Sequence, residues 1–453
     1  MIDIIVILLY LTFPFLVVSF YLLNKESLTA PTLISITFWF YLISAYIGII
    51  ILYFGLDEYR VAIGVTNKEI MIKLLICSGS ALIIFTTSYL IFSKIIEGRY
   101  KVKMIKISEK ARSLKSKEII FLLSLFIASF FVLIFYLFKL PEVPLMAQLK
   151  GYPTAEIKQL RSMATNDFSG SLHYYKIFFE TFLLFICFSF FSNYLIKRNT
   201  ISFMLFIGPF LVSLFVAIHT TAKAPFVWLV IGLVFVYLIT MQKKIVGKYL
   251  LPIGIIILIV LFFFYKYFMG MDTRTNMEIL NSVFSRAFTG QLTPAYYYLE
   301  IFPSQMNYLY GTSFPNPGGL LPFENFRLTV EVMNMKFSHL AGLGIVGSAP
   351  TAYWGELYAN FSYLGILIGS IYIGLILAIT QHFYNSHKKN AVNIAIYVSV
   401  MLELKDISVT GISNFLFNIN FIALVFVFIF FNYFLREQKE KKHGSQINRN
   451  FNL

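Results

Sequence analysis

The chain has 453 residues, of which 58% are hydrophobic, 18% aromatic and only 13% charged, and its mean hydropathy is +0.75. A water-soluble domain could not bury so much apolar surface, so the composition excludes one and indicates that the lipid bilayer is the solvent. A net charge of +15 would suggest nucleic-acid binding in a soluble protein, but here the basic residues gather in short segments between apolar runs, where they orient membrane spans. We therefore exclude nucleic acid as a partner.

The N-terminal segment predicts a retained first membrane span. Met1, Ile2 and Asp3 lead directly into an apolar run that ends near residue 23. A basic leader region and a small-residue cleavage site, which mark a removed signal peptide, are both lacking in this stretch.

Eleven apolar runs are long enough to cross a membrane, because a helix of about 20 apolar residues spans the hydrocarbon layer. They cover residues 2–23, 32–54, 70–93, 119–138, 174–196, 201–218, 225–240, 249–269, 357–380, 391–409 and 413–434. The predicted fold class is therefore all-α, a polytopic membrane protein with about 11 transmembrane helices. It forms a single integral membrane domain over residues 1–453 with two large outer loops.

The distribution of lysine and arginine predicts the orientation. With the N-terminus outside and the C-terminus cytoplasmic, the cytoplasmic loops hold 22 of these residues and the longer outer loops hold 11. Because cytoplasmic loops are enriched in lysine and arginine, we predict this orientation in a bacterial inner (cytoplasmic) membrane. The basic cytoplasmic loop 94–118 is predicted to lie near anionic headgroups and to orient the protein rather than to bind a specific ligand.

The outer loops 139–173 and 270–356 are too long to be simple connectors, so we expect function there. P-loop, CxxC, HExxH and Gly-x-Ser-x-Gly signatures are absent from the sequence. Cys77 and Cys187 lie inside apolar runs and are predicted to be packing residues. The outer segments offer cations, carboxylates and aromatic rings, a set that suits a ligand that is part phosphate and part sugar.

The cations of the outer segments are candidate phosphate ligands, and each has a structural alternative. Arg286 lies in an apolar stretch, where it binds either a phosphate or a carboxylate partner. Lys223 lies in a very short loop and either faces a ligand or extends along the membrane surface. For Arg161, Arg274 and Arg327, ordinary surface charge is the alternative.

Two histidines and a tyrosine run are weaker candidates. His219 and His339 can act as bases near neutral pH, although a single loop histidine is more often plain polar surface. Tyr297, within the run Tyr296–Tyr298, is either a platform for a sugar ring or part of an aromatic belt at the membrane interface.

Glu356 is the most informative carboxylate, because it leads into a membrane helix without a neutralising neighbour. A carboxylate at the hydrocarbon edge is costly, and this favours a function as a general base. The structural alternative is a helix cap or an ion pair. Lys405 and Asp406 interrupt the tenth apolar run and are predicted to pair with each other or with Glu403.

The stretch 347–365, GSAPTAYWGELYANFSYLG, resembles the end of the large outer loop in Wzy-type oligosaccharide repeat-unit polymerases, which make O-antigen or capsular polysaccharide. The resemblance extends to the number of spans and the two large outer loops, to Arg286 followed by Gly290, and to the cation Lys223. In the related O-antigen ligases a histidine-asparagine pair precedes the span that follows the large loop. Residues 348–351 stand there in this chain, and this favours a polymerase over a ligase.

The resemblance implies transfer of a glycan from polyprenyl (undecaprenyl) pyrophosphate to the non-reducing end of a lipid-linked repeat unit, without metal or cofactor. Arg286 and Lys223, with Arg274 or Arg161, would stabilise the leaving pyrophosphate. Glu356 or His339 would accept the proton of the acceptor hydroxyl. The implied partners are the lipid-linked oligosaccharide, membrane lipid, a chain-length regulator and a flippase.

Three other functions compete with this one. A lipid-linked oligosaccharide flippase or another transporter usually carries ionisable residues deep in several spans, which this chain mostly avoids. A polyprenyl-phosphate-sugar-dependent glycosyltransferase typically needs acidic residues in the first outer loop, and Asp57 and Glu58 meet that requirement weakly. A structural scaffold predicts that every outer cation tolerates substitution.

Overall fold

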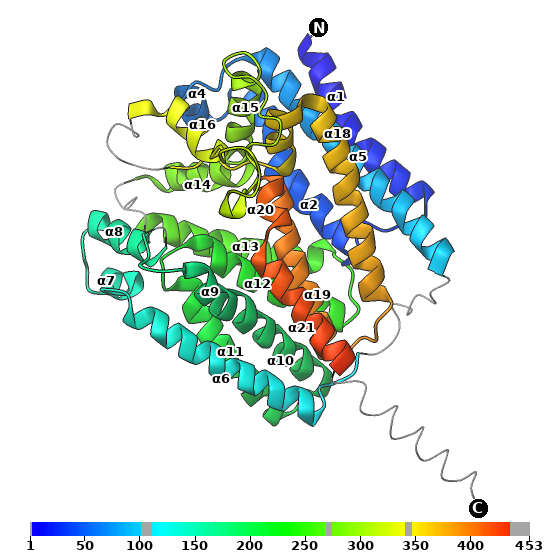
Figure 1. Ribbon diagram of the computed structural model, residues 1–453, viewed down its shortest axis with the longest axis vertical. Coiled ribbons are helices and arrows are strands. Elements are labelled where there is room, and N and C mark those ends of the chain that lie inside the picture. The colour runs from blue at the N-terminus through cyan, green and yellow to red at the C-terminus, as the bar shows by residue number, and fades with distance from the viewer. Residues whose placement is uncertain (1, 101–110, 166, 269–273, 340–346, 435–453) are drawn as a thin grey trace, which may run out of the picture. The chain divides into compact units, whose positions relative to one another are not determined.

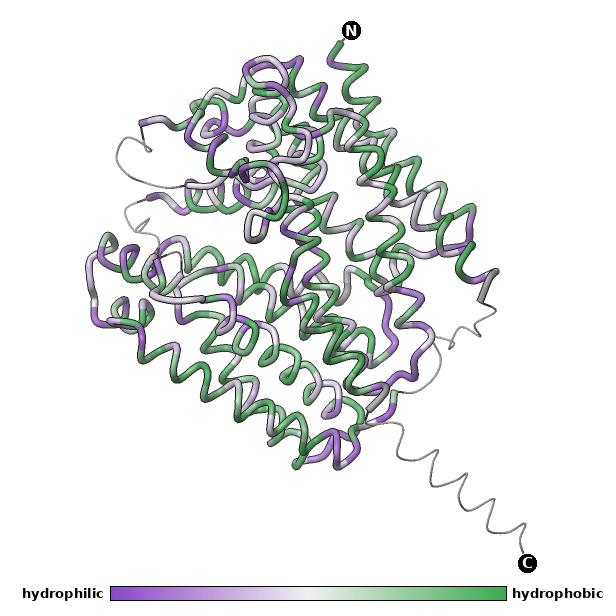
Figure 2. The backbone as a smooth tube through the Cα atoms, viewed as in Figure 1, coloured by the Kyte–Doolittle hydropathy of each residue, from purple (hydrophilic) through white to green (hydrophobic). Residues whose placement is uncertain are grey.

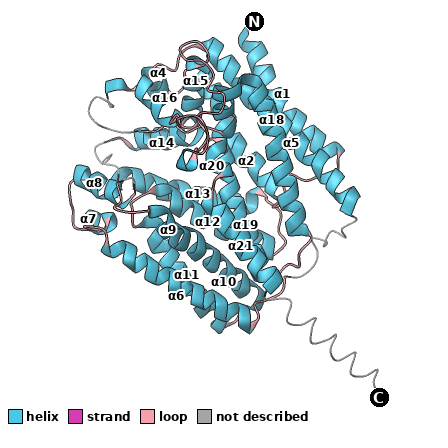
Figure 3. Ribbon diagram, viewed as in Figure 1, coloured by secondary structure: helices cyan, strands magenta, loops and turns pink. Residues whose placement is uncertain are grey.

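The computed structural model describes residues 2–100, 111–165, 167–268, 274–339 and 347–434. The chain is 76% helical, and no strand occurs in the part that the structure describes (Figure 3). The predicted all-α class is confirmed. The long helices are apolar along most of their length (Figure 2).

Nine helices of the described ranges are long and apolar enough to cross a membrane. They cover Ile2–Leu23, Leu33–Tyr53, Lys68–Gly98, Ser116–Phe138, Leu172–Lys197, Thr200–Ile218, Lys223–Thr240, Tyr353–Asn385 and Ile412–Asn432. The predicted count of eleven is not confirmed. Of the two remaining runs, one contains the shorter apolar helix Gly254–Tyr267 and the other ends after the 14-residue helix α19 (Ala391–Leu404).

The chain forms two compact units that each collect separate stretches of sequence. Unit 1 consists of Met1–Met104, Arg274–Ser386 and Leu404–Phe417. Unit 2 consists of Ile105–Thr273, His387–Glu403 and Asn418–Leu453. The predicted outer loop 139–173 therefore belongs to unit 2, whereas residues 274–356 of the second predicted outer loop belong to unit 1.

Unit 1 is built around the packing of two long helices, α5 (Lys68–Tyr100) and α18 (Tyr353–Asn385) (Figure 1). Helix α5 continues through Lys94 to Tyr100, so the predicted loop 94–118 begins later than expected. The other elements of unit 1 are α1 (Ile2–Leu23), α2 (Leu33–Ala45), α3 (Gly48–Tyr53), α4 (Glu58–Ala62), α14 (Asn276–Phe284), η3 (Ser285–Thr289), α15 (Leu292–Ile301), η4 (Pro317–Gly319), α16 (Leu328–Lys336), η5 (Lys405–Ser408) and α20 (Ile412–Leu416).

Helix α18 is interrupted within the membrane-length segment. Phe361 and Ser362 leave helical geometry, and Ser362 has φ 58° and ψ −150°, a conformation that residues with a side chain rarely adopt. The break leaves backbone carbonyls without their helical partners, and such groups need another donor. The backbone N–H groups of Leu309 and Tyr310 donate to the carbonyls of Ala359 and Asn360, at 3.0 and 3.1 Å. A loop from the second predicted outer segment, 270–356, thus completes the hydrogen bonding of the broken helix.

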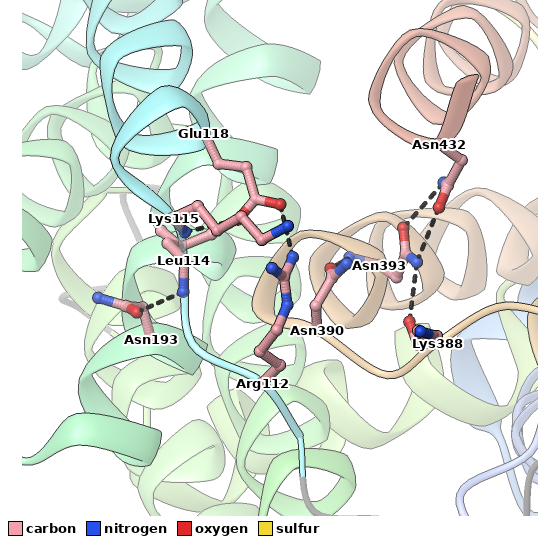
Figure 4. A network of polar contacts seen from close by, with 9 residues as sticks. All are labelled: Arg112, Leu114, Lys115, Glu118, Asn193, Lys388, Asn390, Asn393 and Asn432. Carbon is pink, nitrogen blue, oxygen red and sulfur yellow. Dashed lines mark hydrogen bonds and ion pairs between the residues drawn. The ribbon is translucent and has the colours of Figure 1, made fainter. Parts of the chain in front are cut away.

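Unit 2 is also helical, and a polar network ties its connecting segments to the helix ends (Figure 4). Arg112 Nη2 lies 2.6 Å from Glu118 Oε1, and the backbone N–H of Leu114 donates to Asn193 at 3.0 Å. Asn393 and Asn432 exchange side-chain hydrogen bonds. Besides α19, its elements are α6 (Ser116–Phe138), α7 (Pro144–Leu149), α8 (Thr154–Ala164), α9 (Leu172–Lys176), η1 (Ile177–Phe182), α10 (Leu183–Lys197), α11 (Thr200–Ile218), α12 (Lys223–Thr240), α13 (Gly247–Phe263), η2 (Phe264–Phe268), α21 (Ile419–Ile429) and η6 (Phe430–Phe434).

Replacing Gly374 by alanine should destabilise unit 1. A Cβ at this position would lie 2.6 Å from Ser88 Cβ and 2.7 Å from the Phe85 carbonyl oxygen, so α5 and α18 would have to separate. Overpacking of this kind costs about 1–3 kcal/mol, and we expect a lower melting temperature for the purified protein.

Gly208→Ala is the matched control, because a Cβ there meets no atom within 4 Å. Equal melting temperatures for the two variants would contradict the close approach of α5 and α18.

Candidate functional site

A cavity of about 330 Å³ opens in unit 1 between the end of α15, α16, the start of α18 and α20. Two of the residues predicted from sequence, Glu356 and Arg327, line it. The other lining residues are Tyr298, Ser313, Pro315, Asn325, Phe326, Leu328, Thr329, Val330, Thr351, Gly411, Ser413 and Asn414. Hydroxyl and amide groups thus surround one carboxylate and one guanidinium, a composition suited to a hydroxyl-rich ligand.

Glu356 lies in the first turn of α18 and is 5% exposed. Ser313 Oγ donates to its Oε1 at 2.8 Å, and the backbone N–H of Ser413 donates to its Oε2 at 3.0 Å. Ser413 Oγ lies 2.8 and 2.9 Å from the two carboxylate oxygens. The carboxylate is therefore satisfied by hydroxyl and backbone donors, and the orientation of these donors fixes its position at the cavity wall.

Asn360 connects the cavity wall to the break in α18. Its side-chain amide donates to Ser313 Oγ and to the carbonyl of Glu356, both at 2.8 Å. Its Oδ1 accepts the backbone N–H of Gly311 at 2.8 Å. Ser313, which holds Glu356, is in turn held by Asn360, so the break and the cavity form one hydrogen-bonded network.

Arg327 immediately precedes α16 and is exposed. Within the described ranges its guanidinium makes no hydrogen bond or ion pair with the protein. It is therefore a cation at the cavity that remains open to an anionic or hydroxyl-rich ligand.

A second cluster in unit 1 contains Asp57, Arg60 and Thr289, with Arg286 nearby. Asp57 caps α4 by accepting the backbone N–H of Arg60, and Thr289 Oγ1 donates to Asp57 Oδ2 at 2.6 Å. Burial lowers the pKa of the Arg60 guanidinium, and the positive charge of Arg286 lowers it further, whereas Asp57 raises it. Arg60 was not among the residues predicted from sequence, because nothing local distinguishes it from a surface arginine.

Arg286 is exposed and lies in the π-helical turn η3. The structure explains why position 290 is a glycine. A Cβ there would lie 2.5 Å from the Arg286 carbonyl oxygen and 3.2 Å from Arg286 Cδ. The arginine stem therefore occupies the space that a side chain at position 290 would need.

Tyr297 lies in the interior of unit 1 and is 3% exposed. Burial raises its pKa to about 12, and its hydroxyl donates to the carbonyl of Ile63 at 3.2 Å. Its neighbours Tyr296 and Tyr298 are also buried, with hydrogen bonds to the backbones of Asn67 and Ala349. All three hydroxyls therefore attach loops to α15. This structural role differs from both functions considered for the tyrosines from the sequence, a platform for a sugar ring and an aromatic belt at the membrane interface.

The remaining predicted residues are not among those that line the cavity. Arg274 is exposed at the start of a described range, and His339 is exposed at the end of another, with its ring 6.3 Å from that of Phe337. Arg161 is exposed on α8 of unit 2. Lys223 begins α12 of unit 2, where its Nζ lies 3.1 Å from the ring centre of Tyr265. Arg286 and Lys223, which were expected to act together, therefore belong to different units.

His219 is a buried group in unit 2, with 2% of its surface exposed. Its Nδ1 lies 2.7 Å from the Val216 carbonyl oxygen, and its Nε2 lies 3.3 Å from Tyr136 Oη. Burial lowers its pKa from 6.5 to about 4. The imidazole is therefore neutral near pH 7 and packs among the rings of Tyr136, Phe179 and Phe215.

No protein-family model, curated protein or solved structure matches the chain. Among the residues that the structure describes, no group of three or more His, Cys, Asp or Glu side chains is placed to hold a metal ion. The function of the chain is therefore inferred from its residues, their geometry and the resemblance of residues 347–365.

The burial of His219 predicts a loss of stability on acidification. Below pH 6.5 the unfolded chain binds a proton that the folded protein excludes down to about pH 4, because the folded pKa is the lower one. This loss of folding stability is absent above pH 6.5 and reaches roughly 3 kcal/mol near pH 4. We expect the melting temperature of the wild type to fall more steeply over this interval than that of His219→Gln. Parallel curves for the two proteins would show that this group does not titrate as described.

Proposed function

We propose that the chain is an oligosaccharide repeat-unit polymerase of the outer face of a bacterial inner membrane, with its N-terminus outside and its C-terminus in the cytoplasm. It transfers a glycan from polyprenyl pyrophosphate to the non-reducing end of another lipid-linked repeat unit. The resemblance of residues 347–365 and the excess of basic residues in the predicted cytoplasmic loops support this proposal.

The observation that carries the proposal is the cavity of unit 1, where the Glu356 carboxylate and the Arg327 guanidinium face one polar space. An acceptor sugar would offer hydroxyls to Ser413, Asn325 and Asn414, which donate and accept hydrogen bonds. An acceptor hydroxyl bound in this cavity would have a carboxylate and a guanidinium in the same wall, and such a pair could activate a nucleophile.

The proposed reaction is a displacement at the anomeric carbon of the donor glycan. The acceptor oxygen forms a bond to this carbon, the bond from the carbon to the pyrophosphate oxygen breaks, and Glu356 accepts the proton. The pyrophosphate leaves with the bonding electron pair, so negative charge develops on it. Cations held nearby stabilise that charge. Arg286 of unit 1 is the first candidate, and Arg274, Arg161 and Lys223 remain further candidates.

A polyprenyl-phosphate-sugar-dependent glycosyltransferase is the second candidate, and the position of Asp57 favours it. This acidic residue of the predicted first outer loop is buried. Asp57 is not among the residues that line the cavity of unit 1, and its oxygens accept hydrogen bonds from the Arg60 N–H and the Thr289 hydroxyl. This favours a role in holding the protein together.

Deletion of the gene separates the candidate functions by the glycolipids that accumulate. We expect single lipid-linked repeats on the outer leaflet, because polymerisation is the step that would be lost. Accumulation on the inner leaflet would identify a flippase, and truncated repeats would identify a glycosyltransferase that builds the repeat itself. Either result would contradict the polymerase.

Glu356→Gln should reduce polymer formation by about 10²–10⁴-fold, the usual contribution of a general base. The amide keeps the size of the side chain but cannot accept the proton. Polymer is measured on gels of extracted polysaccharide, and the amount of protein in the membrane is measured in parallel. Glu156→Gln, at an exposed position on α8, is the control. Normal polymer length and amount in Glu356→Gln would exclude this residue as the base.

Arg286→Ala should abolish polymer while leaving lipid-linked single repeats and a normal amount of protein in the membrane. The side chain is exposed, so its removal should change the charge near the leaving group without unfolding unit 1. Full-length polymer in this variant would remove Arg286 from the mechanism.

A further inference from the structure

The guanidinium of Arg60 is buried without a hydrogen-bond acceptor for its Nε. The residue is 8% exposed, and Nε has no hydrogen-bond partner among the described residues. Asp57 Oδ2, the nearest carboxylate oxygen, lies 3.9 Å away, which is beyond hydrogen-bonding distance. Because buried charged groups are nearly always compensated by hydrogen bonds or opposite charge, an anion beside the Arg60 guanidinium would stabilise it.

Asp57 holds Arg60 in place but is already engaged elsewhere. Its Oδ1 accepts the backbone N–H of Arg60 at 3.2 Å, and its Oδ2 accepts the hydroxyl of Thr289 at 2.6 Å. The second bond attaches α4 to the turn η3. Asp57 is therefore a positioning residue that aligns these two segments.

Arg286 adds a second positive charge to the same cluster. It lies in η3, three residues before Thr289, whose hydroxyl bonds to Asp57, and its positive charge lowers the pKa of Arg60. Lys336, which lies over the ring of the adjacent Tyr297, is paired with Glu300 and adds no net charge. The two arginine charges of this cluster thus exceed the single negative charge of Asp57, and the excess positive charge favours binding of an anion.

We propose that Arg60 and Arg286 form a binding site for a phosphate-type anion. A guanidinium presents two N–H groups side by side, and this geometry matches two oxygens of a phosphate. The ring of Tyr59, 5.0 Å from the Arg60 guanidinium carbon, supports one face of the fork.

This site would hold the diphosphate of the donor in the proposed polymerase reaction. Only the identity of the lipid rests on the proposed function. In a polymerase the anion is the diphosphate of the polyprenyl-linked glycan. A free pyrophosphate and the headgroup of an acidic phospholipid offer the same chemistry, so the experiment has to separate these three sources.

The test uses the purified full-length protein in phosphatidylcholine nanodiscs. Farnesyl diphosphate, a short polyisoprenyl diphosphate, is titrated while binding is measured by calorimetry. We expect saturable binding to the wild type and at least about tenfold weaker binding to Arg60→Gln and to Arg286→Gln, because each loses a charged hydrogen-bond donor. Arg198→Gln, at the exposed C-terminal end of α10, should bind as the wild type does.

Two further titrations identify the source of the anion. Inorganic pyrophosphate that binds as tightly as farnesyl diphosphate would support the site with a free anion as its ligand. Weaker binding of farnesyl diphosphate in nanodiscs that contain phosphatidylglycerol would support it with a lipid headgroup as the competitor. Equal binding of all probes to the wild type and both variants would overturn the proposal. If Arg60→Gln does not fold, the exposed Arg286→Gln decides the outcome.

The anion site and the proposed function fail in different ways. Binding that depends on both arginines, in a protein whose deletion leaves polysaccharide unchanged, would keep the anion site and remove the polymerase. Polymer that is lost on deletion, together with diphosphate binding that is unaffected in Arg60→Gln and Arg286→Gln, would keep the polymerase and remove the site.

Discussion

The break in α18 is the constraint on which the architecture of unit 1 depends. A helix of membrane-spanning length that is interrupted at Phe361 and Ser362 leaves carbonyl groups without their usual partners. The chain meets this requirement with the loop around Leu309 and Tyr310, whose N–H groups reach the free carbonyls. Because the loop must lie against the break, Ser313 comes to lie beside Glu356 and Asn360. The cavity is therefore a consequence of how one interrupted helix is completed.

Glycine residues of α18 allow close contacts that hold this interrupted helix in position. Gly374 brings α18 against the backbone of α5, and Gly365 allows the chain to turn sharply after the break. Association of helices in lipid depends on such close contacts, since the hydrophobic effect does little between apolar helices there. The polar network of the cavity is thus supported by an apolar contact that carries no chemistry of its own.

Much of the fold could be predicted from the sequence, because the bilayer demands long apolar helices and the chain contains them. The limits of that prediction are physical. Residues 391–409 have a composition typical of a span, but α19 ends at Leu404, where Lys405 and Asp406 form an ion pair in η5. Hydropathy reports composition and length, whereas the end of a helix depends on tertiary contacts.

The candidate site was predictable only in part. Glu356 stands out because a carboxylate before an apolar run is costly, and the structure places it in a polar cavity with Arg327. Its donors could not be foreseen, because Ser313 and Ser413 lie 43 and 57 residues away in sequence. In the sequence Arg60 resembles an ordinary surface arginine. Its burial becomes evident only in the structure, where Asp57 links α4 to η3. Tyr297 looked like a candidate ligand platform in the sequence, but the structure buries it together with its neighbours Tyr296 and Tyr298.

The discontinuous composition of unit 1 has a consequence for its biogenesis. Ser413 belongs to the last of the three stretches that make up this unit. The ribosome therefore delivers Glu356 to the membrane before its main donor exists, and all helices of unit 2 up to α19 are synthesised before unit 1 is complete. A nascent chain interrupted ahead of Ser413 carries a carboxylate in the first turn of α18 that has the Ser313 hydroxyl as a donor but lacks the donors of Ser413. The hydrogen bonding of Glu356 is therefore complete only after the last stretch of unit 1 has been synthesised.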